Sequence, residues 1–277
     1  MRERHILGIS GGRDSAALAV YMRQHHPNID LEYFFTDTGK ELPEVYSFLE
    51  RLEGFLGRPI KRLNPDRDFD FWLNEYHHFL PSPRTRWCTR QLKLKPLEQW
   101  LKADLEAGVI VNSYVAIRAD EPGREGYQST HANMRVHLPL RAAGIDRKGV
   151  IDILRQSDVG EPKYYQWRSR SGCTFCFFQQ KIEWVRLAER HEAAFADAVA
   201  YEKTALEHGS PFTWSDGENL MELLARKEEI EEDYELRLLR LRRRRPRNPL
   251  SAKVQDETID DVYGIDEASG SCAICHK

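Results

Sequence analysis

Residues 6–18 read Ile6-Leu7-Gly8-Ile9-Ser10-Gly11-Gly12-Arg13-Asp14-Ser15-Ala16-Ala17-Leu18. The apolar start is typical of a buried strand, Gly11-Gly12 of a tight turn, and the alanine-rich continuation of a helix. The first N–H groups of a helix lack partners within the helix, so this series of elements forms an anion-binding site. The hydroxyls of Ser10 and Ser15 add hydrogen-bond donors, and the glycines let a phosphate approach the backbone. The pattern is neither a Walker A loop nor Gly-x-Gly-x-x-Gly. It predicts a phosphate-binding loop.

The bulk composition indicates a globular protein with a large charged surface. The chain has 277 residues, of which 41% are hydrophobic and 31% charged, and its formal net charge is −3. This balance gives no overall attraction to nucleic acid, so such a partner would need a local basic patch. Residues 1–5 run directly into the first strand, which leaves no room for a signal peptide. No apolar run approaches the ~20 residues of a membrane span. We expect a cytoplasmic protein with no membrane partner.

The cysteines are spaced as one single residue and two pairs. Cys88 stands alone, whereas Cys173/Cys176 and Cys272/Cys275 both have Cys-x-x-Cys spacing. A disulfide framework is not expected in a reducing compartment. A four-thiolate metal site cannot use all five cysteines, so at least one is left for another role.

The apolar pattern alternates between strand and helix. Beyond the opening strand, strands are expected at 29–36, 57–63, 109–117 and, at an edge, 136–140. Helices are expected at 15–25, 43–55, 69–80, 91–107 and 148–156. This alternation predicts an α/β fold with a doubly wound, mainly parallel sheet. Ligands of such sheets bind at the carboxyl ends of the strands, where Ser10 and Asp37 both fall. We therefore expect the loops around these two residues to face one site.

We divide the chain into three parts. Residues 1–181 are expected to form a nucleotide-binding domain with a cysteine site, 182–250 a charged helical extension, and 251–277 an acidic, mobile tail. The extension ends in the arginine-rich segment Arg237–Arg247. This segment is either a solvated helix end with i,i+4 ion pairs, or a surface that binds DNA, RNA or a partner protein.

Five stretches, in order, resemble the phosphoadenosine phosphosulfate (PAPS) reductase family of PP-loop enzymes, over roughly residues 5–185. They are Ser10–Ser15, Thr36-Asp37-Thr38-Gly39 with Leu42-Pro43-Glu44, Trp87-Cys88-Thr89-Arg90 with Lys93 and Pro96-Leu97, Ile117-Arg118-Ala119-Asp120-Glu121, and Gly172-Cys173-x-x-Cys176. Within the family, the motifs are most similar to the iron–sulfur sulfurtransferases and DNA phosphorothioation enzymes. The resemblance implies the adenine nucleotide alpha-hydrolase type of fold.

The resemblance also implies how an adenine nucleotide is bound. The PP-loop residues Ser10, Gly11, Gly12, Asp14 and Ser15 would hold the phosphates of ATP, while Thr38 and Gly39 line the adenosine. Asp14 and Asp37 are candidate ligands of Mg²⁺, which prefers one or two carboxylates. Lys93 and Arg118 would neutralise charge that develops on the phosphates. Asp120 and Glu121 would either bind metal or fix these basic side chains.

The cysteines resemble those of the iron–sulfur-dependent adenylylsulfate reductases, which bind a [4Fe–4S] cluster through a Cys-Cys pair and a later Cys-x-x-Cys. Here Trp87-Cys88 replaces the pair, so Cys88, Cys173 and Cys176 would supply three thiolates. The fourth iron would be open, as in sulfur-inserting tRNA thiolases, or bound by Cys272. The alternative is a Zn²⁺ site formed by Cys173/Cys176 with Cys272/Cys275. Their separation far exceeds the ~15–20 residues of a local zinc module.

The last seven residues, Ser271-Cys272-Ala273-Ile274-Cys275-His276-Lys277, leave several roles open. PAPS reductases carry a catalytic cysteine in a mobile C-terminal tail, within Glu-Cys-Gly-Ile/Leu-His, a motif that this tail lacks. Cys275 is our candidate for the catalytic thiol. It would accept persulfide sulfur or form a disulfide during turnover.

The leading hypothesis is an ATP-dependent sulfurtransferase that adenylates an acceptor, releases pyrophosphate and inserts sulfur. The arginine-rich segment makes a nucleic acid the expected acceptor, and a cysteine desulfurase or thioredoxin is a candidate partner. The alternative is a PAPS or adenylylsulfate reductase that produces sulfite. A third class is a subunit that binds nucleotide without turning it over.

Overall fold

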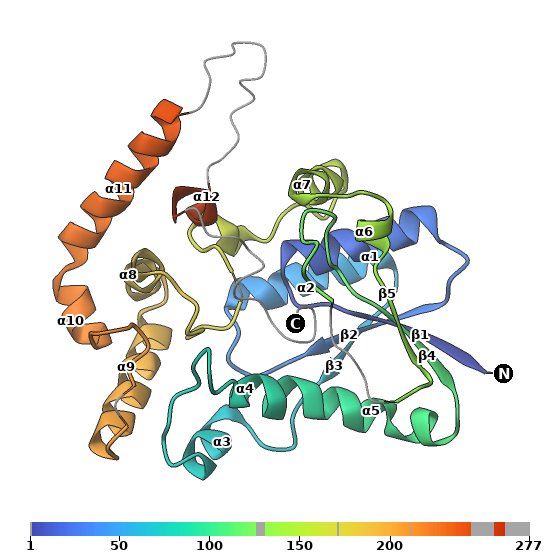
Figure 1. Ribbon diagram of the computed structural model, residues 1–277, viewed down its shortest axis with the longest axis horizontal. Helices are drawn as coiled ribbons and strands as arrows, with labels where there is room; N and C mark the ends of the chain where they lie inside the picture. Colours follow the sequence, from blue (N-terminus) through green and yellow to red (C-terminus); the bar gives the residue numbers. More distant parts are fainter. Residues whose placement is uncertain (1, 126–130, 171, 211, 245–257, 264–277) are drawn as a thin grey trace.

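The computed structural model describes residues 2–125, 131–170, 172–210, 212–244 and 258–263. Its centre is a five-stranded sheet with strand order β3-β2-β1-β4-β5, in which every described pair is parallel (Figure 1). The strands are β1 (Glu3–Gly8), β2 (Leu31–Thr36), β3 (Ile60–Leu63), β4 (Ile110–Tyr114) and β5 (Met134–His137). The predicted α/β fold with a doubly wound parallel sheet is confirmed.

Strand β1 occupies the middle of the sheet. His5 lies in register with Leu31 of β2 on one side and with Asn112 of β4 on the other. Ile6 and Leu7 point to opposite faces, and both are completely buried because helices cover the two faces. The strand order reverses between β1 and β4, which is where parallel sheets of this kind bind ligands.

Helices form a layer on each side of the sheet. Helices α1 (Arg13–His25), α2 (Pro43–Leu56) and α7 (Arg147–Gln156) lie on one side, and α5 (Lys95–Glu106) lies on the other (Figure 1). The α5 side has its own apolar cluster, which includes Ile6 and Phe34 of the strands and Leu101 of the helix. None of the helices in the described ranges has the length and apolar character needed to cross a bilayer.

The helix predicted at 91–107 differs in the structure. It starts earlier, as α4 (Trp87–Thr89), passes through a π-helical turn η1 (Arg90–Leu94) and continues as α5. The N–H of Lys95 donates to the carbonyl of Arg90, five residues back. Pro96 has no N–H to donate and its ring excludes the carbonyl of the preceding turn, which favours a widened turn there. Such turns are common at functional sites, and this one carries Lys93.

Two other predicted elements end earlier than expected. The helix predicted at 69–80 stops as α3 (Phe69–Glu75), since His77 and His78 have φ angles of 52° and 60°. The edge strand predicted at 136–140 ends at His137, because Pro139 begins the short helix α6 (Pro139–Ala142).

The strand predicted at 57–63 begins only at Ile60, because Gly57 caps α2 in the left-handed conformation with φ 64°. The long strand predicted at 109–117 is limited to Ile110–Tyr114. The backbone turns at Ile117, whose N–H donates to the carbonyl of Val115.

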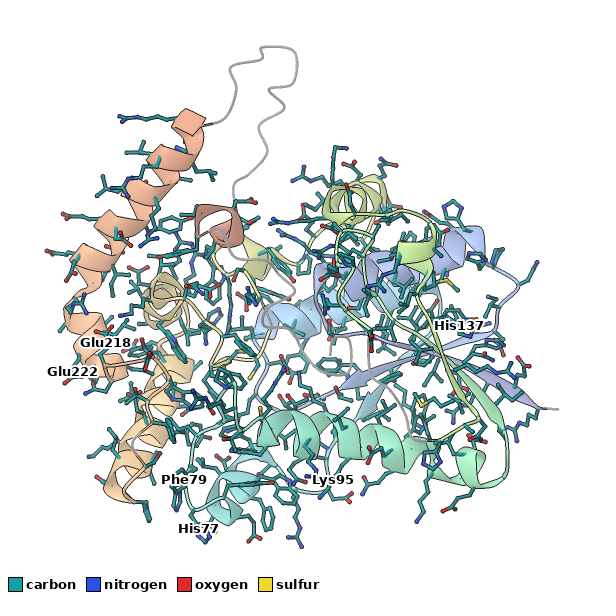
Figure 2. All side chains as sticks on the ribbon, in the orientation of Figure 1. His77, Phe79, Lys95, His137, Glu218 and Glu222 are labelled. Carbon is teal, nitrogen blue, oxygen red and sulfur yellow. The ribbon has the colours of Figure 1, made fainter. Side chains whose placement is uncertain are left out.

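The C-terminal helices form a further group beside the sheet (Figure 1). They are α8 (Lys181–Arg190), α9 (Glu192–Glu207), α10 (Leu220–Ala225) and α11 (Lys227–Arg244). Glu218, labelled in Figure 2, precedes α10 and binds Lys181 at the start of α8. The core is continuous: one apolar cluster contains Leu18 of α1, Trp184 of α8 and Leu223 of α10.

The aromatic residues after the 3₁₀ helix η2 (Lys163–Gln166) connect the C-terminal helices to the sheet region. The ring of Phe175 lies 5.2 Å from that of Tyr201 on α9 and 5.4 Å from that of Trp214. Within the stretch expected to be a tail, Ile259–Tyr263 form helix α12. Asp261 of this helix accepts a hydrogen bond of 2.9 Å from Arg147 of α7.

Candidate active site

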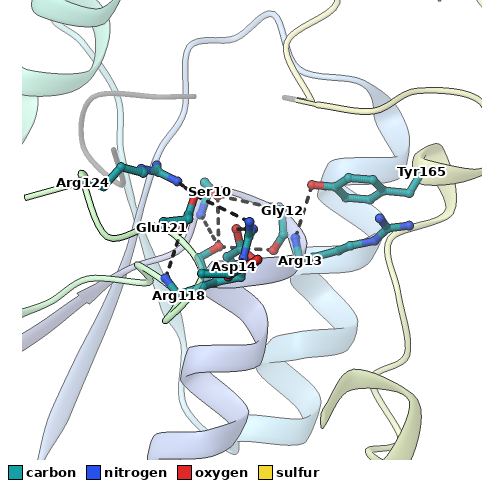
Figure 3. Close-up of polar contacts among 10 residues, drawn as sticks. Ser10, Gly12, Arg13, Asp14, Arg118, Glu121, Arg124 and Tyr165 are labelled. Atoms are coloured by element: carbon teal, nitrogen blue, oxygen red, sulfur yellow. Dashed lines mark hydrogen bonds and ion pairs between the residues drawn. The ribbon is translucent and has the colours of Figure 1, made fainter. Parts of the chain in front are cut away.

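The predicted phosphate loop connects the end of β1 to the start of α1 (Figure 3). The hydroxyls of Ser10 and Ser15 are 3.0 Å apart, and the Ser10 N–H donates to the Ser15 hydroxyl over the same distance. The Gly12 N–H donates to the Ser10 hydroxyl at 3.3 Å. Gly12 is the N-cap of α1 and has no side chain to cap the helix. The loop therefore presents hydroxyls and backbone donors at a helix N-terminus, as an anion site requires.

Gly11 is required for the course of this loop. Its φ of 75° lies in the left-handed region, and a Cβ placed on it would lie 2.7 Å from Cγ1 of Val45 on α2. Both the backbone conformation and the lack of space therefore favour glycine.

A second segment closes over the loop. The Tyr164 hydroxyl donates to the Gly11 carbonyl at 3.1 Å, and the Arg13 N–H donates to the Tyr165 hydroxyl at 3.4 Å. The Arg13 guanidinium lies 3.9 Å from the centroid of the Tyr165 ring. The two tyrosines thus position the loop from helix η2, about 150 residues later in the chain.

Arg118 joins the loop after β4 to the phosphate loop (Figure 3). Its guanidinium is 2% exposed and donates to Asp14 at 3.0 Å and to Asp120 at 2.9 Å. The Glu121 carboxylate lies 3.7 Å away, and it accepts a hydrogen bond from the Arg118 backbone N–H. In this geometry Asp120 and Glu121 fix a basic side chain, the second of the two roles predicted for them. Arg124 also forms an ion pair with Glu121.

The loop after β2 is held by its own side chains. Asp37 accepts hydrogen bonds from the Gly39 N–H at 2.9 Å and from the Tyr46 hydroxyl at 2.8 Å. Burial and the bond to Asp37 raise the pKa of Tyr46. Gly39 has a φ of 72°, and a Cβ there would meet no atom within 4 Å. The backbone at Gly39 is therefore accessible to a ligand, as expected for a residue that lines a nucleotide.

A buried carboxylate that we did not predict lies at the end of this loop. Glu41 accepts a hydrogen bond of 3.0 Å from the Thr38 hydroxyl, and its carboxylate lies 4.0 Å from the Lys93 ammonium. The Glu41 side chain is 2% exposed. Burial raises its pKa, and the Lys93 charge opposes the rise. Lys93 thus has a buried carboxylate as its partner.

The segment around Glu41 pairs with the Cys-x-x-Cys segment. The Leu42 N–H donates to the Gly172 carbonyl at 2.7 Å, and the Thr174 N–H donates to the Lys40 carbonyl at 2.8 Å. These two bonds form an isolated antiparallel bridge between Glu41 and Cys173. The bridge places the cysteine pair beside the predicted nucleotide loop.

One pocket gathers the three cysteines of the described chain. Its wall includes Cys88, Cys173, Cys176, Thr38, Lys40, Arg86, Lys93 and four phenylalanines, Phe69, Phe175, Phe177 and Phe178. Burial raises the pKa of the Cys88 thiol to about 11, and it also raises the pKa of Cys173 and of Cys176. The structure therefore brings the predicted thiols to one cavity. Within the described ranges, no three His, Cys, Asp or Glu side chains are already arranged as a metal site.

Arg168 lies directly behind the cysteine pair. Its side chain is completely buried, and its Nη2 donates to the Cys173 carbonyl at 2.6 Å. Its Nε and Nη1 atoms have no hydrogen-bond partner among the described residues. The donor set fits an iron–sulfur cluster or Zn²⁺, since thiolates bind both and buried N–H donors suit the sulfur atoms.

The phosphate loop and the cysteine segment pack on the same side chain, that of Val45. Cβ atoms placed on Gly11 and on Gly172 would both collide with Val45, at 2.7 Å and 2.1 Å. Each backbone therefore packs directly on a methyl group of this one side chain. The phosphate loop and the cysteine segment are therefore neighbours in the fold.

Several predicted residues lie outside the described part of the chain. These are Cys272, Cys275 and the end of the arginine-rich segment, from Arg245 to Arg247. Of the described arginines in that segment, Arg237 pairs with Asp233 at 2.7 Å, one turn back on α11. This bond is the i,i+4 ion pair of a solvated helix.

Four residues of the site were missed in the sequence: Glu41, Val45, Tyr164 and Arg168. The pair Tyr164-Tyr165 and the arginines just before Gly172 were visible as unusual local composition. Nothing in the local sequence indicates that Glu41 is buried against Lys93, because their contact joins distant segments.

Comparison with known families agrees with this geometry. Residues 4–132 match the phosphoadenosine phosphosulfate reductase domain. The matched segment contains the phosphate loop, Asp37 to Gly39, Cys88 and Arg118. It ends before β5, so Cys173 and Cys176 lie outside it.

Curated relatives include two uncharacterized proteins. One is MJ0066 of Methanocaldococcus jannaschii, 27% identical over 176 residues, which are 62% of this chain and 35% of that protein. The other is the nin region protein ORF290 of Escherichia phage lambda, 28% identical over 145 residues, which are 43% of this chain and 50% of that protein. The chain thus spans a third to a half of the length of these relatives.

Among solved structures, the PAPS reductase of Candida auris in complex with phosphate is similar to the chain at 15% identity, with a TM-score of 0.47. The match covers 61% of this chain and 81% of that one.

Proposed function

We propose that this chain is an ATP-dependent sulfurtransferase of the PP-loop type. ATP binds at Ser10–Ser15, an acceptor oxygen attacks its α-phosphorus, and pyrophosphate leaves. Sulfur supplied at the cysteine pocket then attacks the acceptor atom that carries the activated oxygen, and AMP leaves. This sequence consumes one ATP, forms one bond to sulfur and needs no external oxidant.

The observation that carries this proposal is that the phosphate loop and the cysteine segment both pack on the side chain of Val45. A phosphate loop on one side of this residue and a cysteine segment on the other are brought together by the fold. A reaction that both activates an acceptor with ATP and delivers sulfur needs these two sites within reach of each other, since proximity supplies much of the rate enhancement.

The chain's own residues have distinct tasks in this proposal. The hydroxyls of Ser10 and Ser15 and the N-terminal donors of α1 hold the phosphates. Arg118 stabilises the charge that develops on the leaving pyrophosphate, and Asp120 keeps it oriented. Asp14 and Asp37 are the proposed Mg²⁺ ligands, and each already has a polar partner that restricts its rotation.

Cys88, Cys173 and Cys176 are proposed to hold a [4Fe–4S] cluster, and the alternative is Zn²⁺ held by Cys173/Cys176 with Cys272/Cys275. When bound, a cluster whose fourth iron is open would supply a place for the transferred sulfide; otherwise Cys272 is the proposed fourth ligand. Cys275 is the proposed thiol that accepts persulfide sulfur from a cysteine desulfurase, and the two electrons that release this sulfur as sulfide come from reduced thioredoxin. Nucleic acid is the proposed acceptor, bound through the arginines of Arg237–Arg247, and a cysteine desulfurase or thioredoxin is the proposed partner.

The second candidate is the reduction of PAPS or adenylylsulfate to sulfite. The match of residues 4–132 to the PAPS reductase domain favours it. In that reaction the same loop would hold the substrate nucleotide, and a thiol would supply the electrons.

The test measures pyrophosphate release from Mg²⁺-ATP by the anaerobically prepared chain, with sulfide as donor and total transfer RNA or sheared DNA as acceptor. We expect Asp14→Ala to lower the rate by at least about 100-fold, which corresponds to ~2.7 kcal/mol of transition-state stabilisation. Asp30→Ala is the matched control, because the Asp30 side chain is 83% exposed and, among the described residues, its ion-pair partner is Arg58 on the surface. Its rate should stay within about twofold of wild type.

Two outcomes would contradict the proposal. Equal rates for the wild type and Asp14→Ala would remove the phosphate loop from the reaction. Sulfite release from PAPS or adenylylsulfate with reduced thioredoxin, without pyrophosphate release from ATP, would establish the second candidate instead.

A further inference from the structure

Arg168 is a buried cation with unused hydrogen-bonding capacity. Its side chain is among the largest fully buried ones in the described chain, with 1% exposure. Within the described ranges, its Nη2 donates to the carbonyl of Cys173, which is a neutral group. Nε and Nη1 lack acceptors within the described ranges. An arginine keeps its charge in a protein, so burial without an anionic partner is costly.

Two buried carboxylates lie near Arg168. Glu41 interacts with it electrostatically and also faces Lys93 at 4.0 Å, and Glu183 accepts the N–H of Ser169, the residue next to Arg168. Within the described ranges, neither carboxylate accepts a hydrogen bond from the guanidinium. Tyr164, the other ionisable group near Arg168 on the phosphate-loop side, is neutral because burial raises its pKa.

The sulfur atoms of the cysteine pair also lie within the electrostatic influence of Arg168. The guanidinium acts on both Cys173 and Cys176. As neutral thiols they are only weak hydrogen-bond acceptors for Nε and Nη1 of Arg168. As metal-bound thiolates they are anionic acceptors: three thiolates with one Zn²⁺ carry −1, and thiolate-bound iron–sulfur clusters are also anionic.

We infer that Arg168 is a positioning residue that provides the buried counter-charge for an anionic, thiolate-bound metal centre at Cys88, Cys173 and Cys176. Its bond to the Cys173 carbonyl fixes the turn of the cysteine pair, and its unpartnered Nε and Nη1 groups are the donors that we assign to that centre. This inference rests on the metal centre of the proposed function. Hydrogen bonds and charges outside the ligands tune such centres strongly.

The test compares three variants of the full chain, Arg168→Met, Arg168→Gln and Arg168→Lys, prepared without oxygen. Arg186→Met is the matched control. Arg186 also donates to a backbone carbonyl, that of Trp167 at 3.4 Å, and packs on the Tyr234 ring. Iron, zinc and acid-labile sulfide per chain are measured before and after a challenge with a metal chelator, and circular dichroism reports folding.

We expect the neutral variants to retain metal with ~10–100-fold lower affinity than the wild type, as for the loss of other groups that support metal ligands. Arg168→Lys restores the charge and should recover most of this loss, and Arg186→Met should match the wild type. If iron is bound, the midpoint potential of the neutral variants should be more negative, because a lost positive charge disfavours the reduced cluster. A merely structural role for Arg168 would not shift the potential in this direction.

The outcomes separate the two proposals. A folded wild type that binds neither iron nor zinc overturns the metal centre and this inference together. A loaded wild type with Arg168→Gln equal to it in metal retention overturns the inference alone. If Arg168→Met does not fold, the comparison of Arg168→Gln with Arg168→Lys decides, and equal retention by these two contradicts a role for the charge.

Discussion

Gly11, in the loop that follows β1, has a φ of 75°, and a Cβ at this position would collide with the side chain of Val45. We expect Gly11→Ala to lower the free energy of unfolding by about 1–3 kcal/mol, because the alanine is strained by its φ and collides with the valine methyl. Nucleotide binding should weaken as well. Urea unfolding and titration with a fluorescent ATP analogue measure the two effects.

Gly54 provides the matched control for this substitution. It lies within α2, and a Cβ there meets no atom within 4 Å. Gly54→Ala should therefore raise stability by roughly 0.5–1 kcal/mol through better helix propensity. Equal effects of the two alanines would mean that Gly11 is not constrained as described.

The residues of the site differ in how far the sequence predicted them. Ser10, Gly11 and Ser15 were recognisable because strand, turn and helix follow one another directly, and their roles depend on local backbone geometry. Arg168 and Glu41 were not, because their roles arise from burial beside groups that are distant in the sequence. A charged residue in a polar stretch is normally expected at the surface.

At the scale of elements, helices α8 and α10 are joined by one carboxylate. Glu218 accepts hydrogen bonds from Lys181 and, at 2.9 Å, from Arg226. Burial raises the pKa of Glu218, but the two cations outweigh burial and the net shift is downward. A carboxyl group with a lowered pKa in the folded state stabilises the fold above its unfolded pKa. This contribution is lost as the pH falls through the folded pKa.

We therefore expect Glu218→Gln to be less stable than the wild type near pH 7, and the difference to disappear as the pH falls through the lowered pKa of Glu218 in the folded state. Chemical unfolding at several pH values measures this gap. Glu207→Gln is the control, because the Glu207 side chain is 60% exposed and lies 4.0 Å from Lys203. A gap for Glu218→Gln that is constant with pH would contradict the ion pairs.

The order and type of the main elements were predictable, whereas several of their ends were not. The alternation of strands and helices was correct because buried parallel strands read as short apolar runs. The π-helical turn at Arg90–Leu94 was missed because its apolar spacing resembles that of an ordinary helix. Within the predicted helical extension that begins at residue 182, the chain breaks at His191 between α8 and α9, which the composition does not indicate.

For the molecule as a whole, the C-terminal helices and the sheet region share one core. Phe175 lines the cysteine pocket and packs against Tyr201 and Trp214, and Trp184 packs against Trp214 in turn. A chain that ends at residue 181 would expose this aromatic surface to water. We expect it to aggregate or to lack a cooperative unfolding transition.

The full chain should unfold in one transition, with tryptophan fluorescence and circular dichroism changing together. A chain that ends at Tyr263 retains α8 to α12 and is the control; it should behave like the full chain. A soluble 1–181 fragment with its own sharp transition would show that the sheet region is independent of the C-terminal helices.

The central place of β1 in the sheet has a consequence for the order in which the protein folds. His5 is made well before its partner Asn112 in β4, which follows only after β2, β3 and α5. Until β4 is synthesised, β1 has an open edge, and pairing across such a long stretch of chain is slow. Arg118, which anchors Asp14, comes just after β4. The phosphate loop, although encoded before β2, is therefore completed only after β4 has been made.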